Sequence, residues 1–412
     1  MNVRLDQEAV RTGEKTLVAA YGGWSVDAFD FMIYTFVIPT LIVSWGMSKV
    51  EAGLIATSAL VMSAIGGWAA GALSDRFGRV RMLQITIAWF ACFTFLCGFT
   101  DSFTELLIVR SLQGLGFGGE WAVGSVMISE MIQARHRGKA AGTVQSGWAV
   151  GWGAAALFFA IFFTWLPEDL AWRALFWIGL APALLIVYIR RNVKDPEIFT
   201  ATRARAATGG AHFLEIFSPR LLRVTMLTAL MATGMQGGYY AVTTWLPTYL
   251  KTVRGLSVLN TGGYLAVIIL GSLAGYLVAA WLSDRIGRRN TFFVFALCSA
   301  VTAVAYTLIP ISDGLMLILG FPLGFFVSGN FSGVGAYFTE LFPSRVRGSG
   351  QGFAYNFGRG IGALFPALVG YLSATMPLGQ AIGIFAGSAY VVVIIAVAFL
   401  PETRGKVLQV YD

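Results

Sequence analysis

The sequence of 412 residues is 57% hydrophobic and only 12% charged, about half the charged fraction of an ordinary soluble domain. This composition excludes a soluble enzyme and predicts a chain that lies mostly within a lipid bilayer. The formal net charge of +8 would suit a nucleic-acid binder, but the positions of the basic residues, described below, are those of a membrane protein.

Apolar segments long enough to cross a bilayer recur along the chain, since one span takes about 20 mainly apolar residues. The first fifteen residues are charged and contain no short apolar run with a cleavage site, so we expect the first helix to be retained. The predicted fold class is an all-α membrane protein with 12 transmembrane helices. The predicted spans are 16–44, 51–73, 82–99, 103–129, 139–164, 172–189, 221–249, 260–282, 291–309, 314–339, 348–374 and 380–400.

The basic residues predict the orientation, because cytoplasmic loops of membrane proteins carry an excess of Lys and Arg. With both termini in the cytoplasm, 23 of the 29 Lys and Arg fall in cytoplasmic segments. The expected location is therefore the inner membrane of a bacterial cell, crossed many times. The exceptions are Lys49, Arg173, Lys251 and Arg254 outside, and Arg110 and Arg359 within spans.

The three cysteines and two histidines indicate neither a metal site nor a cofactor. Cys92, Cys97 and Cys298 lie inside predicted helices, where a free cysteine packs as a small apolar side chain. His136 and His212 fall in predicted loops without a second ligand nearby.

An internal duplication divides the chain, because three segments recur after nearly constant intervals of 205 to 210 residues. We predict an N-terminal six-helix half at 1–190, a cytoplasmic linker at 191–220 and a C-terminal six-helix half at 221–412. The matching pairs are 74–79 with 283–288, 130–138 with 340–348, and 196–197 with 401–402.

Two of these motifs resemble signatures of the major facilitator superfamily. Gly71-x-x-x-Asp75-Arg76-x-Gly78-Arg79 is similar to the signature between helices 2 and 3, and its second copy departs from it at Ala280. Arg110-x-x-x-Gly114-x-Gly116 is similar to the helix 4 motif. The resemblance implies two six-helix halves with a substrate site between them near the membrane midplane.

In that family, charged groups at the cytoplasmic helix ends form ion pairs that hold this side shut. The alternative is a set of solvated surface pairs worth under about 1 kcal/mol each, but the presence of the set in both halves favours a gate. The predicted gating residues are Asp75, Arg76, Arg79, Glu130, Arg135, Asp284, Arg285, Arg288, Glu340 and Arg345.

Five ionisable residues fall well inside predicted spans, where a charge costs at least about 2.5–3.5 kcal/mol. Arg359 lies about 16 Å from the start of its span at about 1.5 Å per residue. An arginine at that depth suits a carboxylate ligand, which it can bind through two parallel hydrogen bonds. Asp30 and Arg110 lie at similar depth and can pair.

The three acids within spans are candidates for proton coupling: Asp27, Asp30 and Glu120. Asp27 and Asp30 share one helix face, and burial together with a neighbouring carboxylate disfavours two negative charges there. One of them is therefore expected to hold a proton at neutral pH. The alternative is that both acids are permanently paired and purely structural.

Polar and aromatic residues recur on the helices expected to line the central cavity, as in the stripe of Trp24, Asp27, Phe31 and Tyr34 on one face of the first span. An aromatic stripe alone more often reflects packing, and a buried charge beside it is what indicates a ligand site. The predicted substrate-binding residues are Arg359, Arg110, Tyr34, Gln145, Trp148, Gln236, Tyr239, Tyr240, Asn330, Tyr355 and Asn356.

The Gly-rich segment 114–119 fits a dinucleotide-binding pattern, but it lies within an apolar helix and lacks the preceding strand that such a site needs. Glycines at this spacing instead predict close helix packing. The same holds for the pairs Gly147/Gly151, Gly271/Gly275 and Gly358/Gly362.

The segment Asp27-Ala-Phe-Asp30 resembles the D-x-x-D motif of the sialate and aromatic-acid proton symporters, a group that includes monocarboxylate carriers. Segments 114–124 and 244–250 are similar to the same group. This resemblance makes Asp27 and Asp30 the coupling acids and Arg359 the anion-binding residue. Ala28 departs from the glycine usual in the aromatic-acid branch, which favours the sialate and monocarboxylate branch.

The predicted function is proton-coupled import of a small organic anion by alternating access. The expected partners are this anion, a proton and the bilayer, without nucleic acid, and the expected state is a monomer. One alternative is a proton-coupled sugar or polyol porter, because 401–406 resembles the ending of sugar porters. Another is a transporter-like sensor, but such proteins carry long cytoplasmic tails.

Overall fold

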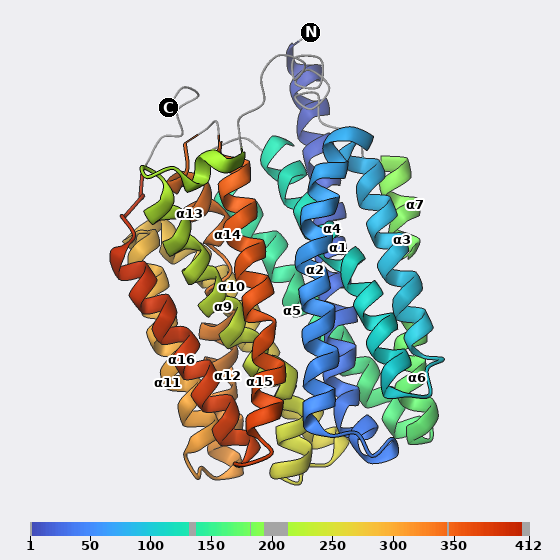
Figure 1. Cartoon of the computed structure of the whole chain (residues 1–412). Coiled ribbons are helices and arrows are strands. Elements are labelled where there is room, and N and C mark those ends of the chain that lie inside the picture. The colour runs from blue at the N-terminus through green and yellow to red at the C-terminus, as the bar shows by residue number, and fades with distance from the viewer. Residues whose placement is uncertain (1, 132–136, 182, 193–212, 344–345, 406–412) are drawn as a thin grey trace.

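The computed structural model describes residues 2–131, 137–181, 183–192, 213–343 and 346–405. Within these ranges, side chains are outside the description at several helix positions, including 2–16, 71–72, 74–76, 79, 120–131 and 137–141. The described elements are all helices, and they form two bundles that stand side by side, with the start of α1 and the described segment after α16 at one end (Figure 1). The opposite end is called the far end below.

The first bundle holds the N-terminal six predicted spans. Its sixth span is formed by two shorter helices, and its first helix begins well before residue 16. The elements are α1 (Asn2–Ser44), α2 (Lys49–Phe77), α3 (Arg79–Cys97), α4 (Phe103–Met131), α5 (Arg137–Trp165), α6 (Glu168–Ile178) and α7 (Ala183–Asn192).

The second bundle follows a short 3-10 helix, η3 (Phe213–Phe217), which is the described part of the predicted linker. A π-helical turn, η4 (Tyr249–Val253), extends its first helix at the far end. The other elements are α9 (Leu222–Thr248), α10 (Val258–Ile286), α11 (Arg288–Leu308), α12 (Asp313–Gly329), α13 (Val334–Leu341), α14 (Arg347–Gly362), α15 (Leu364–Leu372) and α16 (Leu378–Phe399).

Every predicted span coincides with a helix or a pair of helices. Among the described residues, eight spans are long and apolar enough to cross a membrane by themselves. The helix α9 is not among them, because it carries polar groups such as Gln236 that face protein, and α14 is not among them because it is only 16 residues long. The eleventh span breaks near Ala363 because Pro366, lacking an N–H, cannot donate to the carbonyl four residues earlier.

The duplication reappears in the helix packing. A Cβ on Gly114 of α4 would strike the carbonyl of Ala59 in α2, and a Cβ on Gly324 of α12 would strike that of Ile268 in α10. These two contacts are related by shifts of 210 and 209 residues, the same intervals as the sequence motifs. The glycines therefore allow equivalent helix pairs to approach closely in both bundles, as predicted for 114–119 and Gly271/Gly275.

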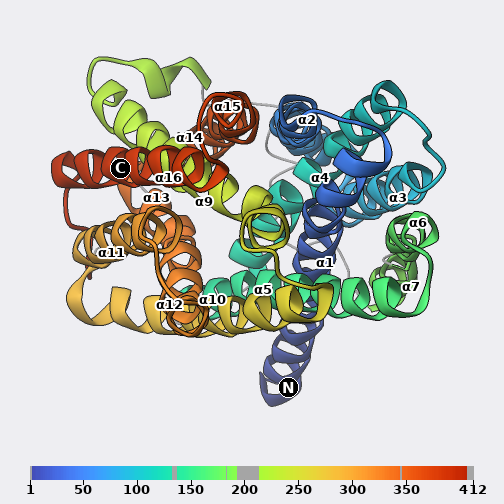
Figure 2. The same ribbon diagram turned by 90° about the horizontal axis from the view of Figure 1, so that it is seen from below.

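The bundles meet along three seams: α5 with α10, α2 with α14 and α15, and α1 with α9 (Figure 2). Near the far end, the Thr57 hydroxyl donates to the Ala363 carbonyl at 2.6 Å, and the Ala367 N–H donates back to Thr57 at 3.2 Å. Lys251 pairs with Glu168 across the same end at 3.3 Å. The two bundles are thus hydrogen-bonded together at the far end.

Candidate substrate site

A small cavity lies between the two bundles. Its wall combines seven aromatic side chains with one amide and one guanidinium, and Arg359 is the only charged member among the described lining residues. Such a wall offers flat apolar surface and a single positive charge. The lining residues are Trp24, Gln145, Trp148, Tyr239, Tyr240, Tyr276, Phe331, Tyr355 and Arg359.

The N-terminal side of the cavity is a cluster of packed rings. Trp24 of α1 and Trp148 of α5 have ring centroids 4.9 Å apart. The ring centroid of Phe31, about two helical turns beyond Trp24, lies 6.0 Å from that of Trp148 and 5.7 Å from that of Tyr240. This i, i+7 spacing on α1 presents both rings to the same side, which is the stripe that the sequence predicts.

Two hydrogen bonds cross the cavity from one bundle to the other. The Trp148 indole Nε1 donates to the Tyr239 hydroxyl at 2.5 Å. The Gln145 amide Nε2 donates to the backbone carbonyl of Phe331 at 3.2 Å. Both donors lie on α5 and both acceptors lie in the C-terminal bundle, so separating the bundles at this level breaks both bonds.

Arg359 is 1% exposed and reaches toward the opposite bundle. Its guanidinium lies over the rings of Tyr355 and Phe117, with Cζ 5.1 and 5.4 Å from the centroids, and Nη1 is 3.4 Å from the Ser63 hydroxyl of α2. The guanidinium also interacts electrostatically with Asp27 of α1. Planar stacking on aromatic rings suits arginine in particular, because its guanidinium is flat and weakly hydrated.

Glycines bring α14 close enough to α9 to hold Arg359 in this position. A Cβ on Gly358 would strike Ala232, and a Cβ on Gly362 would lie 2.7 Å from the backbone nitrogen of Gly237. The close packing predicted for the pair Gly358/Gly362 is therefore confirmed.

A second buried polar cluster lies inside the N-terminal bundle, around Asp30 and Arg110. The Asp30 carboxylate accepts a hydrogen bond from Thr94 at 2.9 Å, and Thr94 in turn accepts one from Gln113 at 3.0 Å. The Arg110 guanidinium lies 3.5 Å from the backbone carbonyl of Asp30 and 5.0 Å above the Tyr34 ring. Asp30 and Arg110 are thus neighbours, but the direct contact is to the main chain and not to the carboxylate.

Six of the eleven predicted substrate-binding residues line the cavity, and five lie elsewhere. The five residues outside the wall differ because each of their side chains has a partner within its own bundle. Arg110 and Tyr34 belong to the Asp30 cluster. Asn330 donates to Ser299 of α11, and Asn356 donates to the Gly352 carbonyl. Gln236 donates to the Tyr355 carbonyl and accepts from the Tyr240 hydroxyl. The six in the wall are Arg359, Gln145, Trp148, Tyr239, Tyr240 and Tyr355.

Three wall residues are absent from the predicted set: Trp24, Tyr276 and Phe331. Trp24 was available from the α1 stripe, which also contains Asp27. Phe331 directly follows Asn330, where the helix break between α12 and α13 turns the next side chain toward the cavity. Tyr276 lies on α10, a helix not expected to line the cavity, and no sequence signal marks it.

The candidate proton-coupling acids differ in their surroundings. Asp27 and Asp30 are both fully buried. Asp27 interacts with Arg359 across the two bundles, whereas Asp30 accepts a hydrogen bond from Thr94 and interacts with Arg110 within one bundle. The side chain of Glu120 lies outside the described residues.

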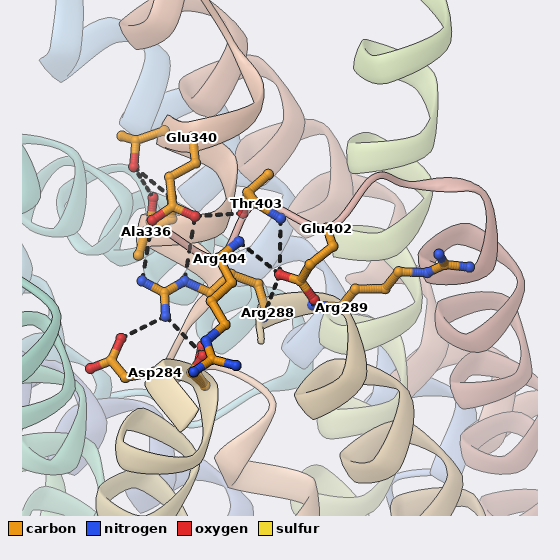
Figure 3. A network of polar contacts seen from close by, with 11 residues as sticks. Asp284, Arg288, Arg289, Ala336, Glu340, Glu402, Thr403 and Arg404 are labelled. Atoms are coloured by element: carbon orange, nitrogen blue, oxygen red, sulfur yellow. Dashed lines mark hydrogen bonds and ion pairs between the residues drawn. The ribbon is translucent and has the colours of Figure 1, made fainter. Parts of the chain in front are cut away.

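Figure 3 shows a network of polar contacts at the end that carries the termini. Arg288 pairs with Asp284 at 2.5 Å and with Glu340 at 3.2 Å. Thr403 donates to Glu340 at 2.5 Å, so the segment after α16 joins the same network. Of the predicted gating residues, Arg285 instead lies over the Trp281 ring. The side chains of Asp75, Arg76, Arg79, Glu130, Arg135 and Arg345 lie outside the described residues.

Glu402 is a member of this network that the predicted gating set lacks. Its carboxylate accepts from the backbone N–H groups of Arg288 and Arg289 at 2.9 and 3.1 Å. These N–H groups open α11 and have no partner within the helix, so Glu402 caps it. The segment 401–403 is therefore anchored to the start of α11.

The chain matches the family model described as Major Facilitator Superfamily over residues 22–365 and 270–410. The chain belongs to the major facilitator superfamily. The predicted twelve-helix fold of two six-helix halves is thereby confirmed, as is its identification as a multi-pass membrane transporter and not an enzyme.

Named relatives within the superfamily cover almost the whole chain. The "Probable 4-methylmuconolactone transporter" of Cupriavidus pinatubonensis is 44% identical over 96% of this chain and 92% of its own length. The "Cis,cis-muconate transport protein" of Acinetobacter baylyi is 30% identical, with 92% of each chain covered. The solved structure of the proton:xylose symporter XylE has a TM-score of 0.72 at 20% identity, covering 96% of this chain and 98% of its own, which is a likeness of fold alone.

Proposed function

We propose that this chain imports a small organic anion together with a proton by alternating access, with both termini in the cytoplasm. The observation that carries the proposal is Arg359: a buried arginine, and the only charged described residue in the wall of a cavity between the two halves. A bilayer protein retains such a charge at high cost. A substrate carboxylate is the ligand that a buried guanidinium binds best, through two parallel hydrogen bonds.

The aromatic wall supports a flat, unsaturated substrate. Rings stacked or tilted at about 5–6 Å offer planar faces, and Trp148, Tyr239, Tyr240 and Tyr355 present them around Arg359. 4-Methylmuconolactone and cis,cis-muconate, for which two relatives are named, are both unsaturated carboxylic acids. The proposal therefore favours unsaturated or aromatic acids over the sialate and monocarboxylate branch that Ala28 favours.

Asp27 is the proposed coupling residue, because it shares Arg359 with the substrate. When Asp27 is ionised, it interacts favourably with Arg359 and competes with an incoming carboxylate. A proton on Asp27 removes that competitor and leaves the guanidinium to the substrate. Proton and carboxylate then bind together, and both are released when the cavity opens to the cytoplasm.

The gate at the cytoplasmic side is proposed to be the network of Asp284, Arg288 and Glu340, with its counterpart in the first half at Asp75, Arg76, Arg79 and Glu130. Arg288 and Glu340 are largely shielded from solvent, with side chains 13% and 12% exposed, so their pairing is stronger than that of an ordinary surface pair.

Proton uptake by proteoliposomes tests the proposal directly. The purified protein is challenged with 4-methylmuconolactone, cis,cis-muconate, nicotinate, benzoate, lactate, sialate, glucose and xylose, and external pH is recorded. Alkalinisation on adding an unsaturated or aromatic acid supports symport of that class. A response to sugars alone would replace it by the sugar-porter alternative, and binding without proton movement would refute coupling.

A further inference from the structure

The Tyr239 hydroxyl is an incompletely used donor in the cavity wall. Tyr239 is 2% exposed, and its hydroxyl oxygen accepts the Trp148 indole hydrogen. No acceptor for the hydroxyl proton itself is found among the described residues. The neighbouring Tyr240 differs, because its hydroxyl donates to Gln236 at 3.2 Å.

A tyrosine hydroxyl can donate one hydrogen bond while it accepts others. Accepting the Trp148 hydrogen polarises the Tyr239 O–H and makes it a stronger donor, since hydrogen bonds in a chain reinforce one another in a low dielectric. A buried donor without an acceptor is unfavourable. A ligand oxygen or nitrogen in the cavity is the natural partner for it.

The charge of the wall decides what kind of acceptor fits there. Arg359 is the only charged side chain of the nine, and Tyr240, Tyr355 and Phe117 surround it. Near Tyr239 the described wall offers neutral groups: the Trp148 indole, the Gln145 amide and the Phe331 ring. A carboxylate placed there would lose its hydration without gaining a cation, which is costly.

We propose that the Trp148–Tyr239 pair selects substrates that carry one carboxylate and, across an unsaturated ring, a neutral hydrogen-bond acceptor such as a lactone carbonyl or a ring nitrogen. This inference rests on the proposed binding of a carboxylate by Arg359. It assigns Tyr239 as the donor to the neutral acceptor and Trp148 as the residue that orients and polarises Tyr239. Dicarboxylates are excluded by the missing second cation.

Matched ligand pairs test the selection. Nicotinate and benzoate differ in a ring nitrogen, and 4-methylmuconolactone and 2-cyclopentene-1-acetate differ in the lactone group, while all four carry one carboxylate. Dissociation constants in detergent are measured by tryptophan fluorescence or calorimetry. In the unaltered protein the acceptor-bearing member of at least one pair is expected to bind about tenfold more tightly than its partner, the equivalent of one good hydrogen bond.

Tyr239→Phe removes the hydroxyl and keeps the ring, so it should reduce that preference to less than about twofold by weakening only the acceptor-bearing ligand. Trp148→Phe should reduce it partially. Tyr306→Phe is the control, because Tyr306 on α11 is also fully buried, its hydroxyl has no hydrogen-bond partner in the described part of the chain, and it is outside the cavity wall.

The outcomes separate this inference from the proposed function. Equal affinity within both pairs, or a Tyr239→Phe variant that keeps the preference, overturns the inference and leaves carboxylate binding intact. So does cis,cis-muconate binding as tightly as the preferred monocarboxylate. Absence of binding by every acid, in protein that melts cooperatively, overturns carboxylate binding itself and the inference with it.

Discussion

At the scale of single residues, charge in the membrane was the informative signal. Arg359 could be singled out from the sequence because an arginine deep in a span needs a reason, and the structure places it in the cavity wall. The direction of uncharged polar side chains could not be predicted in the same way. Asn330 directly follows the end of α12, so the helical periodicity of that span does not predict the direction of its side chain. The side chain donates to Ser299 and does not line the cavity.

Replacing Arg359 by lysine tests the geometry of anion binding and not only its charge. Lysine keeps the positive charge but loses the fork for a carboxylate and the flat stacking on Tyr355 and Phe117. We expect the apparent affinity for the transported acid to fall about tenfold or more in uptake assays. The control is Arg173→Lys, because the Arg173 guanidinium donates to the Gly98 and Thr100 carbonyls away from the cavity. This variant should leave the affinity for the acid unchanged. Equal affinity in both variants would contradict the assignment.

Replacing Asp27 by asparagine separates coupling from transport. The variant cannot bind the proton, so acidifying the outside should no longer drive accumulation, whereas exchange of labelled for unlabelled acid should persist. The unaltered protein should accumulate more acid as the external pH falls below the internal pH. The exposed Asp313, which pairs with Arg254 at the far end, provides the control Asp313→Asn. Accumulation that survives in Asp27→Asn, Asp30→Asn and the double variant would exclude both acids.

At the scale of elements, most of the fold followed from hydropathy. Span length and the repeat of motifs predicted where the helices lie, because a bilayer imposes both length and apolar character. The breaks within the sixth, tenth and eleventh spans were not predicted. The break in the eleventh span has a cause in the sequence, Pro366, which span length and hydropathy do not register. The breaks in the sixth and tenth spans depend on how neighbouring helices satisfy backbone groups.

Gly118→Ala tests the close packing of α2 and α4. A Cβ at Gly118 would strike the Ser63 carbonyl, a backbone atom that cannot move aside cheaply, whereas a Cβ at Gly352 of α14 meets nothing within 4 Å. We expect Gly118→Ala to destabilise the protein by about 1–3 kcal/mol and to lower its melting temperature in detergent. Gly352→Ala should leave the temperature unchanged or raise it, since alanine favours helix. Equal melting temperatures would show that the α2–α4 contact is not limiting.

At the scale of the whole molecule, the contacts between halves lay beyond sequence reasoning. Thr57 and Ala363 are hydrogen-bonded but 306 residues apart, and no motif or spacing connects them. The duplication predicts two similar bundles, but it does not predict which residues of one bundle contact the other. At the far end the seam between the bundles joins α2 to Ala363 and to α15 in the present conformation.

Alternating access requires this seam to open, and a cross-link should prevent it. In a background without the native cysteines, Thr57→Cys with Ala367→Cys places one thiol on each side of the seam, on two residues that are in direct hydrogen-bond contact. Oxidation should abolish uptake, and a reductant should restore it. Ser272→Cys with Ser328→Cys is the matched pair within one half, where the hydroxyls are 2.8 Å apart, so its oxidation should leave uptake intact. If the Thr57–Ala367 disulfide forms and uptake continues, the far-end seam stays closed throughout transport, and the substrate must enter the cavity by another route.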